Sequence, residues 1–318
     1  MSSASPHSRA LQTTLRALVE QLAVFLVLAS AIFFALRLLP GDPATLILGD
    51  RAGEAERKVL RARLHFDEPL RVQYVHFLRN LSSLDFGESL RRPGMKVTRT
   101  LLTALGSTSL LACLSVFFAA IVGIISAVLS NGSWLGKNKR WVERSRLLVS
   151  AVPLLVLAPV VTYLVTCKMR LLPLPGDPDA GATGLLFAAG LLALPLSAQV
   201  GRVTHVALAS QARLPFLLAV RARGGSEIRM WGMHALAPVL GPVVTVISTQ
   251  LGALLGGALV LEKLFDRRGL GMLIVESYSS RDFPLLEAAL IGAGALFIAT
   301  QAMGRMAHLA IDPRVRGS

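Results

Sequence analysis

Charged residues are scarce in this chain. Asp, Glu, Lys and Arg make up 16% of its 318 residues, whereas hydrophobic residues make up 53%. Soluble globular proteins have about a quarter of their residues charged. The scarcity of charge therefore excludes an ordinary soluble globule and places the chain in a lipid bilayer.

Cysteine and metal-ligand patterns are also sparse. The two cysteines, Cys113 and Cys167, fall at different depths of two apolar segments, so we expect no disulfide between them. The six histidines are scattered, and none pairs with a cysteine at the spacing of a zinc site. We therefore expect no metal site within this chain alone.

The chain also lacks signs of catalysis or of its own energy source. The nearest match to a phosphate-binding loop, at 132–138, has three residues instead of four between its glycines and no Ser or Thr after Lys137. The centres of the apolar segments carry no charge, unlike those of most gradient-driven carriers. No nucleophile and base lie at matching depth, so we predict no enzyme, and any uphill transport must be driven by another subunit.

What is abundant is apolar length. Several segments are close to the roughly 20 residues that cross a bilayer, and we predict an all-α integral membrane protein with six transmembrane helices. The first segment is too long for a cleavable signal and is interpreted as an uncleaved anchor. In the fourth, Pro195 predicts a kinked helix that continues toward Val206. The six segments are Leu18–Leu39, Leu105–Leu129, Leu147–Cys167, Gly184–Val200, Val239–Leu261 and Leu285–Ala307.

Basic residues predict the orientation. The loops 131–146 and 201–236 each carry a net charge of +4, whereas the loop between the third and fourth segments is neutral. Because short basic loops stay on the cytoplasmic side, both termini are expected there. The resulting domains are a cytoplasmic N-terminus at 1–17, a first span at 18–39, a periplasmic loop at 40–99, a membrane core at 100–307 with a coupling loop at 206–236, and a cytoplasmic C-terminus at 308–318.

The net charge of +14 raises the alternative of nucleic-acid binding. The basic residues are divided among several loops, and no aromatic-studded basic module accompanies them. We therefore assign these charges to membrane topology and to contacts with anionic lipid, and expect no nucleic-acid partner.

The long loop after the first segment is the largest predicted element outside the membrane. Apolar residues at helical spacing predict one helix over Arg51–Leu64 and a second over Pro69–Leu81, where proline suits the first turn. We interpret the loop as a small helical cap packed on the external end of the bundle.

The loop between the fourth and fifth segments has the pattern of a helical hairpin. Leu217–Arg223 predicts a short helix, Gly224 and Gly225 a break, and Ser226 a cap for a second helix that runs to Ala237. Pro215 shortens the first helix, because the residue before a proline avoids helical torsions. Such a hairpin, with Phe216, Leu217 and Val220 exposed among arginines, could dock into a groove of a cytoplasmic protein, and the alternative is an amphipathic hairpin that contacts only lipid.

Several motifs of this chain, in their order along the sequence, resemble motifs of the permease subunits of bacterial dipeptide, oligopeptide and nickel ABC importers. The coupling segment of that family is similar to Ala219–Ser226 with His234–Leu236 and Pro242, and its signature after the first span is similar to Leu39–Pro43. Together the similar motifs cover nearly the whole chain. The others are Asp85–Leu90, Gln250–Gly252, Gly256–Ala258, Glu262, Phe265, Gly269–Gly271, Arg281–Pro284 and Asp312–Arg314.

The resemblance implies a subunit of the bacterial inner membrane that pairs with a second permease. Cytoplasmic ATPase subunits would bind ATP and Mg, so that this chain needs no cofactor, and a solute-binding protein would deliver the substrate, with peptides expected before nickel or sugars. The chain would form half of the translocation path. The residues implied in coupling to the ATPase are Phe216, Ala219, Arg221, Ala222, Arg223, Gly224, Ser226 and Glu227.

Some positions depart from the family. Pro215 stands where the family has an acidic residue, Leu218 where it has a basic one, and Ala237–Pro238 where it has a basic residue followed by Asn. These changes would weaken polar contacts with the ATPase. The alternatives to a working permease are therefore a degenerate permease and a non-transporting membrane scaffold or sensor that uses the basic hairpin for docking.

Small residues in the fifth segment suggest close helix packing. Gly252 and Gly256 share a helix face and Gly257 lies beside them. We interpret the three as a packing surface, against the partner permease, rather than as substrate contacts. Glu262 follows this segment, and we interpret it as a solvated helix end rather than as a gate residue.

Overall fold

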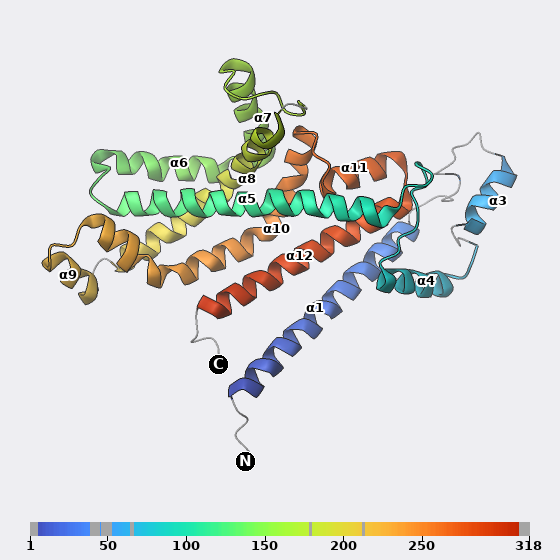
Figure 1. Ribbon diagram of the computed structural model, residues 1–318, viewed down its shortest axis with the longest axis horizontal. Coiled ribbons are helices and arrows are strands. Elements are labelled where there is room, and N and C mark those ends of the chain that lie inside the picture. The colour runs from blue at the N-terminus through green and yellow to red at the C-terminus, as the bar shows by residue number, and fades with distance from the viewer. Residues whose placement is uncertain are drawn as a thin grey trace, which may run out of the picture. The chain divides into compact units, whose positions relative to one another are not determined.

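The computed structural model describes residues 6–38, 45, 53–63, 67–177, 180–211 and 214–311. The chain divides into two compact units, which are described separately. Unit 1 comprises 1–107 and 268–298, and unit 2 comprises 108–267 and 299–318. Within the described ranges, regular structure is helical (Figure 1), and the β-structure is an isolated bridge between Glu88 and Lys96.

Among the described residues, five helices are long and apolar enough to cross a membrane, and the count rises to six if one bent pair forms a single span. Five of the six predicted spans fall in these helices. The fourth is confirmed as α8 (Gly181–Gln211), which contains Pro195 and continues past Val206. The five candidate spans are Leu18–Arg37, Val97–Asn131, Gly181–Gln211, Ala237–Leu264 and Phe283–Ala307.

The third predicted span, Leu147–Cys167, is a bent pair of helices and not one straight helix. The helix α6 (Lys139–Ala151) ends at Val152, and α7 (Leu154–Thr162) begins after Pro153, with the two segments bent by 112°. Val152 and Pro153 have extended ψ angles of 123° and 140°, as expected around a proline. The π-helix η2 (Tyr163–Lys168) then continues α7, and the short 3-10 helix η1 (Gly136–Asn138) precedes α6.

Unit 1 contains α1 (Pro6–Arg37), α3 (Glu54–Arg63), α4 (Leu70–Ser83), the first turns of α5 (Val97–Asn131), α11 (Leu270–Ser280) and the first part of α12 (Phe283–Ile311). The two helices predicted in the external loop are confirmed as α3 and α4. Figure 1 shows α4 beside the C-terminal end of α1. Their aromatic side chains pack together, with the Phe33 ring 5.0 Å from that of Phe77 and 5.3 Å from that of Tyr74.

Arg37 fastens α1 to two other helices of unit 1. Its guanidinium donates to Gln73 Oε1 of α4 at 3.0 Å and to Glu287 Oε1 of α12 at 3.1 Å, and it stacks on the Phe33 ring at 3.6 Å. The fork of an arginine can serve several acceptors at once while its stem covers apolar surface. One side chain thus orients three helices.

Unit 2 contains most of α5, together with α6, α7 and α8. It continues through α9 (Pro215–Ala222), the π-helix η4 (Arg229–Ala235), the 3-10 helix η5 (Ala237–Val239) and α10 (Leu240–Leu264). One cluster of buried apolar side chains joins these elements, from Leu111 on α5 through Leu196 on α8 to Leu261 on α10. Both cysteines lie in unit 2 and are free.

Two glycines let α5 and α8 approach closely. A Cβ atom on Gly123 would lie 2.7 Å from Val200 Cγ1 and 2.9 Å from the Ser197 carbonyl oxygen, and one on Gly201 would lie 2.8 Å from Ser126 Oγ. Small residues allow such backbone contact between membrane helices, where van der Waals packing replaces the hydrophobic driving force.

The interpretation of Glu262 as a solvated helix end is wrong. Its side chain is fully buried in unit 2, and its Oε1 accepts a hydrogen bond from Thr108 Oγ1 at 2.5 Å. Glu262 belongs to the last turn of α10 and Thr108 to α5. This buried polar contact ties the two helices together, because a buried carboxylate needs a hydrogen-bond donor.

We predict that Gly123→Ala lowers the free energy of unfolding by about 1–3 kcal/mol, the usual cost of overpacking. Gly106→Ala on α5 and Gly190→Ala on α8 are matched controls, because their Cβ atoms would meet nothing within 4 Å. Alanine favours helices over glycine, so the controls should be neutral or slightly stabilised. Thermal unfolding in detergent measures the difference, and an equal loss in all three variants would contradict the close crossing.

Candidate functional site

The helix α9 lies in the segment that the sequence predicts to be a docking hairpin. Leu214 is extended, with φ −72° and ψ 141°, and Pro215 occupies the first turn, where its missing N–H costs no hydrogen bond. Leu217 is only 2% exposed and joins the buried cluster that contains Met230 and Trp231 of η4. Burial of Leu217 therefore anchors α9 to the rest of unit 2.

The other side of α9 faces outward. Phe216 is 41% exposed, and Ala219, Arg221 and Ala222 are also exposed. The expectation that Leu217 and Val220 would be exposed is wrong, because Leu217 is buried and Val220 is partly buried against the same cluster. The helix thus presents one aromatic ring among basic residues, while the leucine face holds it in place.

The end of α9 is a Schellman motif. Gly224 has a φ of +73°, and its N–H donates to the Arg221 carbonyl, while the N–H of Gly225 donates to the Val220 carbonyl, both at 3.0 Å. A left-handed residue in this position is the commonest use of glycine at a helix end. Gly225 is also required, because a Cβ there would lie 2.9 Å from the Val220 carbonyl oxygen. The predicted break at the two glycines is confirmed.

The second helix of the hairpin begins after Ser226, as predicted. Ser226 Oγ accepts a hydrogen bond from the Arg229 N–H at 3.4 Å, in the manner of an N-cap. From Arg229 to Ala235 the helix has π-type hydrogen bonding, and η5 then leads into α10. Pro238 has no N–H to donate, which prevents a regular α-helix from continuing through this point.

Glu227 connects the hairpin to the turn after α5. Its Oε2 accepts hydrogen bonds from the Ser133 backbone N–H at 2.7 Å and from the Ser133 hydroxyl at 2.8 Å. These bonds stabilise the ionised carboxylate and hold the pKa of Glu227 below its usual value. The segment after α9 is therefore linked to the connection between α5 and α6.

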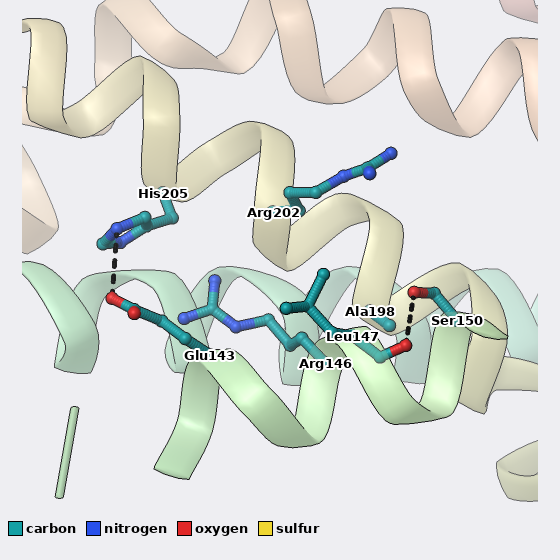
Figure 2. A pocket seen from close by; sticks show the side chains of 7 residues that line it. All are labelled: Glu143, Arg146, Leu147, Ser150, Ala198, Arg202 and His205. Atoms are coloured by element: carbon teal, nitrogen blue, oxygen red, sulfur yellow. Dashed lines mark hydrogen bonds and ion pairs between the residues drawn. The ribbon is translucent and has the colours of Figure 1, made fainter. Parts of the chain in front are cut away.

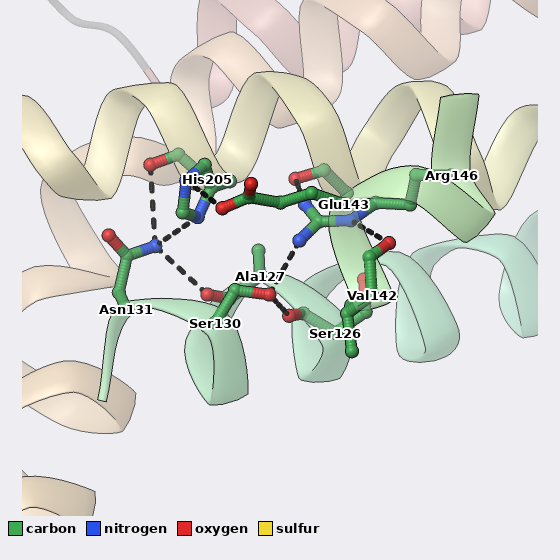
Figure 3. Close-up of polar contacts among 9 residues, drawn as sticks. Ser126, Ala127, Ser130, Asn131, Val142, Glu143, Arg146 and His205 are labelled. Carbon is green, nitrogen blue, oxygen red and sulfur yellow. Dashed lines mark hydrogen bonds and ion pairs between the residues drawn. The ribbon is translucent and has the colours of Figure 1, made fainter. Parts of the chain in front are cut away.

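Arg146 forms a polar centre among α5, α6 and α8 (Figure 3). Its side chain is 9% exposed. The guanidinium donates to the Gly201 carbonyl of α8 at 2.8 Å and to Ser130 Oγ of α5 at 2.5 Å, and Nε donates to the Val142 carbonyl of α6. A buried guanidinium is tolerated because these acceptors replace its lost hydration.

His205 lies one turn along α8 from Gly201. Asn131 Nδ2 approaches its Nδ1 at 2.8 Å, and its Nε2 lies 3.7 Å from Glu143 Oε1. The ring thus lies between the Asn131 amide of α5 and the Glu143 carboxylate of α6. His205, Arg146 and Arg202 line a small cavity of about 140 Å³. Figure 2 shows how these side chains lie.

These polar residues were not assigned to a site from the sequence. Arg146 counted only as a charge that sets topology, and Asn131, Ser133 and His205 had no assigned role. The sequence signal that could have drawn attention to Arg146 is its position next to a long apolar run. Its partners, Ser130 and Gly201, have no distinctive pattern.

Most of the predicted coupling residues are exposed. Phe216, Ala219, Arg221, Ala222, Arg223, Gly224 and Ser226 are exposed, and Glu227 is partly buried at the Ser133 contact. Of the positions that depart from the resemblance, Ala237 and Pro238 are exposed. The motifs at 39–43 and 312–314 lie outside the described parts of the chain, as does Arg213. The backbone of Leu218 is described as part of α9, but its side chain is not.

The three glycines of α10 have different surroundings. A Cβ on Gly257 would lie 2.8 Å from Leu154 Cδ2 and 2.9 Å from Leu192 Cδ1, so this position packs against α7 and α8 of the same chain. A Cβ on Gly256 would meet nothing within 4 Å, and this position is exposed. Gly252 is partly buried. Gly256 is therefore free to pack against another molecule.

The described residues contain no group of three or more His, Cys, Asp or Glu side chains that could hold a metal ion. The arrangement could transmit movement, because hydrogen bonds and buried side chains link the exposed helix α9 and the segment after it to the ends of longer helices.

Comparison with protein families gives two matches that together span most of the chain. Residues 119–317 match the model described as the inner membrane component of binding-protein-dependent transport systems, and residues 10–90 match the model of the N-terminal part of such membrane components. All of α6–α10 and α9 in particular fall within the first match.

Several curated proteins are similar along nearly their whole length. A probable peptide ABC transporter permease protein, y4tP of Sinorhizobium fredii, is 30% identical over 312 residues, which cover 95% of this chain and 98% of the relative. The glutathione transport system permease protein GsiC of Salmonella typhimurium is 30% identical, with 96% and 99% covered. The oligopeptide transport system permease protein OppB of Haemophilus influenzae is 29% identical, with 94% and 97% covered.

One solved structure has a similar fold. It is the MetNI methionine ABC transporter in inward-facing conformations, with a TM-score of 0.54 and 18% sequence identity. The similarity covers 67% of this chain and 96% of the chain in that structure. At 18% identity this similarity is evidence for the fold alone.

We predict that Glu227→Gln loosens the turn 132–135 and the segment 226–235, because an uncharged amide is a weaker acceptor for the Ser133 donors. Amide hydrogen exchange at neutral pH should become faster in both segments. In the wild type, the contact is fully formed above the ordinary carboxyl pKa and weakens as the pH falls through the lowered pKa of Glu227. Glu54→Gln, at an exposed position of α3, is the control, and unchanged exchange in Glu227→Gln would refute the link.

Proposed function

This chain belongs to the family of inner membrane components of binding-protein-dependent transport systems, and we propose that it forms half of the translocation path for di- or oligopeptides. The chain is the permease subunit of an ABC importer, an inner membrane protein without an ATPase site of its own. Such a component works with a binding protein and an ATPase. The peptide substrate is supported by the names of several relatives.

In the proposed orientation, α9 and both chain termini face the cytoplasm, and α3 and α4 face the periplasm. The basic residues of the loops at 131–146 and 201–236 support this orientation, because short basic loops remain on the cytoplasmic side. The Ser133–Glu227 contact brings these two loops together, which fits their assignment to one side.

The observation that carries the proposal is the way α9 is held. Leu217 is buried and attaches the helix to unit 2, while Phe216, Arg221 and Arg223 are exposed. An amphipathic helix with an aromatic anchor and flanking arginines suits a groove on a cytoplasmic partner. We assign that partner as the ATPase subunit, which binds ATP and Mg and so supplies the energy that this chain lacks.

Movement of α9 would reach the membrane helices through two routes. One is the buried cluster around Leu217 and Trp231, and the other is the pair of hydrogen bonds between Glu227 and Ser133. Arg146 holds α5, α6 and α8 together beside this turn, so the three helices would move as one body. The nucleotide-driven closure of the ATPases would thereby swing these helices.

The second permease would pack against α10. Between Thr245 and Leu259 its exposed residues recur every three or four positions, as expected for one helix face, and most are small. A face of this kind suits a partner helix better than lipid, because small side chains permit close backbone approach. The residues are Thr245, Thr249, Ala253, Gly256 and Leu259.

The first test is to purify the chain from its native membrane in mild detergent and to identify what accompanies it. We expect an ATPase and a second permease, and ATP-dependent uptake of tri-alanine when the importer is reconstituted with its binding protein. Intact chain recovered without either subunit would favour the membrane scaffold or a degenerate permease. Recovery of both without peptide uptake would refute the proposed substrate.

The same assay tests α9. Gly224→Pro should abolish ATP-driven uptake while membrane insertion is retained, because proline cannot adopt the φ of +73° found at Gly224. Gly224→Asn is the matched control at the same position, since asparagine tolerates left-handed torsions, and it should retain most of the uptake. Wild-type uptake by Gly224→Pro would contradict the role of the hairpin.

Gly256→Leu and Gly257→Leu separate packing between chains from packing within the chain. The first should reduce recovery of the second permease by about tenfold or more and leave the thermal stability of the isolated chain unchanged, because a Cβ at Gly256 meets nothing. The second should lower the stability of the chain itself by about 1–3 kcal/mol. Full recovery of the partner with Gly256→Leu would argue against α10 as the interface.

A further inference from the structure

A second cavity, of about 780 Å³, lies within unit 1. Its walls come from the segment 89–104, which leads into α5, and from the segment 268–285, which contains α11 and the start of α12. Small-molecule sites in proteins usually have volumes of about 300–1,000 Å³. The cavity is therefore large enough for a solute of the size of a short peptide.

Four arginines line this cavity, namely Arg91, Arg92, Arg99 and Arg268. The lining contains two carboxylates, of Glu276 and Asp282. Asp282 is only 1% exposed, and its oxygens already accept hydrogen bonds from the Ser89 hydroxyl and, at 3.2 Å, from the Leu90 N–H. The positive side chains thus outnumber the one carboxylate that remains exposed.

The basic wall is held in place by its own backbone. The Ser89 N–H donates to the Met95 carbonyl and the Val97 N–H to the Gly87 carbonyl, both at 3.0 Å, beside the bridge between Glu88 and Lys96. Arg91 Nε donates to the Ser280 carbonyl at 2.6 Å. Together with the Asp282 contacts, these bonds fasten the segment that carries Arg91 and Arg92 to the end of α11.

Helix ends add to the positive potential. α5 begins at Val97, α11 at Leu270 and α12 at Phe283, and residues in or next to the first turn of each helix line the cavity. None of the three helices has an acidic residue in its first turn. Each N-terminus carries a partial positive charge. At α12 the Asp282 carboxylate already lies beside this end, so the N-termini of α5 and α11 are the two that favour a ligand anion.

The cavity also has an apolar part. Met95, Ala104, Met272, Leu273 and Leu285 share the lining with the arginines. A ligand with a carboxylate at one end and a chain of mixed polarity behind it would satisfy both parts. The forked guanidinium group suits a carboxylate in particular, because it can donate two parallel hydrogen bonds.

We propose that this cavity is an entry site that binds the carboxylate of the solute after its release from the binding protein. The proposal rests on the proposed function, in that the solute is a peptide and the α5 N-terminus faces the periplasm. Arg92, Arg99 and Arg268 are exposed to solvent, so their attraction for the ligand is screened and binding is reversible. A transport path requires such weak binding, because the solute must leave the site again.

The test uses the importer purified through this chain, in nanodiscs of phosphatidylcholine. Phenylglyoxal modifies accessible arginines, and mass spectrometry measures the rate at each one. Millimolar tri-alanine should slow modification of Arg92, Arg99 and Arg268 several-fold, whereas tri-alanine amide, which lacks the carboxylate, should not. Arg79, exposed on α4 outside the cavity, is the internal control and should react equally under all conditions.

Equal protection by the acid and the amide, or protection by neither, would overturn the proposal. Slower modification in phosphatidylglycerol nanodiscs without peptide, together with no effect of tri-alanine, would assign the cavity to a lipid phosphate and also overturn it. A separate measurement tests the proposed function: absence of ATP-dependent tri-alanine uptake by the reconstituted wild type would refute it. Protection without uptake would leave the carboxylate site standing and refute the substrate.

Charge-removing variants test whether the site acts in transport. Arg92→Gln with Arg268→Gln should raise the tri-alanine concentration for half-maximal uptake about tenfold, the effect expected for loss of a charge-assisted hydrogen bond. Basal ATPase activity and peptide binding by the binding protein should be unchanged. Arg79→Gln is the matched control, and equal uptake curves for all three proteins would refute a role in entry.

Discussion

The close crossing of α5 and α8 is the constraint on which the rest of unit 2 depends. Gly201 leaves its carbonyl open to the Arg146 guanidinium, and a Cβ at this position would lie 3.0 Å from Arg146 Cδ. The missing side chain therefore serves two purposes, since it permits the helices to touch and lets an arginine from α6 reach between them. Without that acceptor the guanidinium would be buried with too few partners, which costs more than the contact itself contributes.

This arrangement makes one end of unit 2 stiff and leaves α9 as its adjustable part. Arg146 and the His205–Asn131 pair join α5, α6 and α8 to each other, whereas α9 is attached by Leu217 and Val220 and ends in a glycine turn. A movement of an exposed short helix reaches the longer helices only if direct contacts connect the two. The Ser133–Glu227 bonds meet this condition, because they join the hairpin directly to the turn that follows α5.

Local features of the sequence predicted the local structure well, and features that depend on distant partners were missed. Apolar length predicted five spans, and Pro215, Gly224 and Ser226 predicted the hairpin, because each acts on its own backbone. The break in the third span was missed because hydropathy averaged over Leu147–Cys167 conceals the effect of Pro153. The burial of Glu262 could not be predicted, since its partner Thr108 is 154 positions away and neither residue has a pattern that points to the other.

The arginines show why a net charge of +14 has no single explanation. Orientation in the membrane requires only that basic residues lie in short loops, whatever their neighbours. Arg37 and Arg146 instead have fixed geometry, each with acceptors from two or more helices, so lysine could replace their charge but not their forked contacts. The arginines around the cavity of unit 1 are exposed, and Arg91 donates to the Ser280 carbonyl at the end of α11. Because four guanidinium groups gathered at one cavity repel each other, a ligand with negative charge would stabilise their clustering.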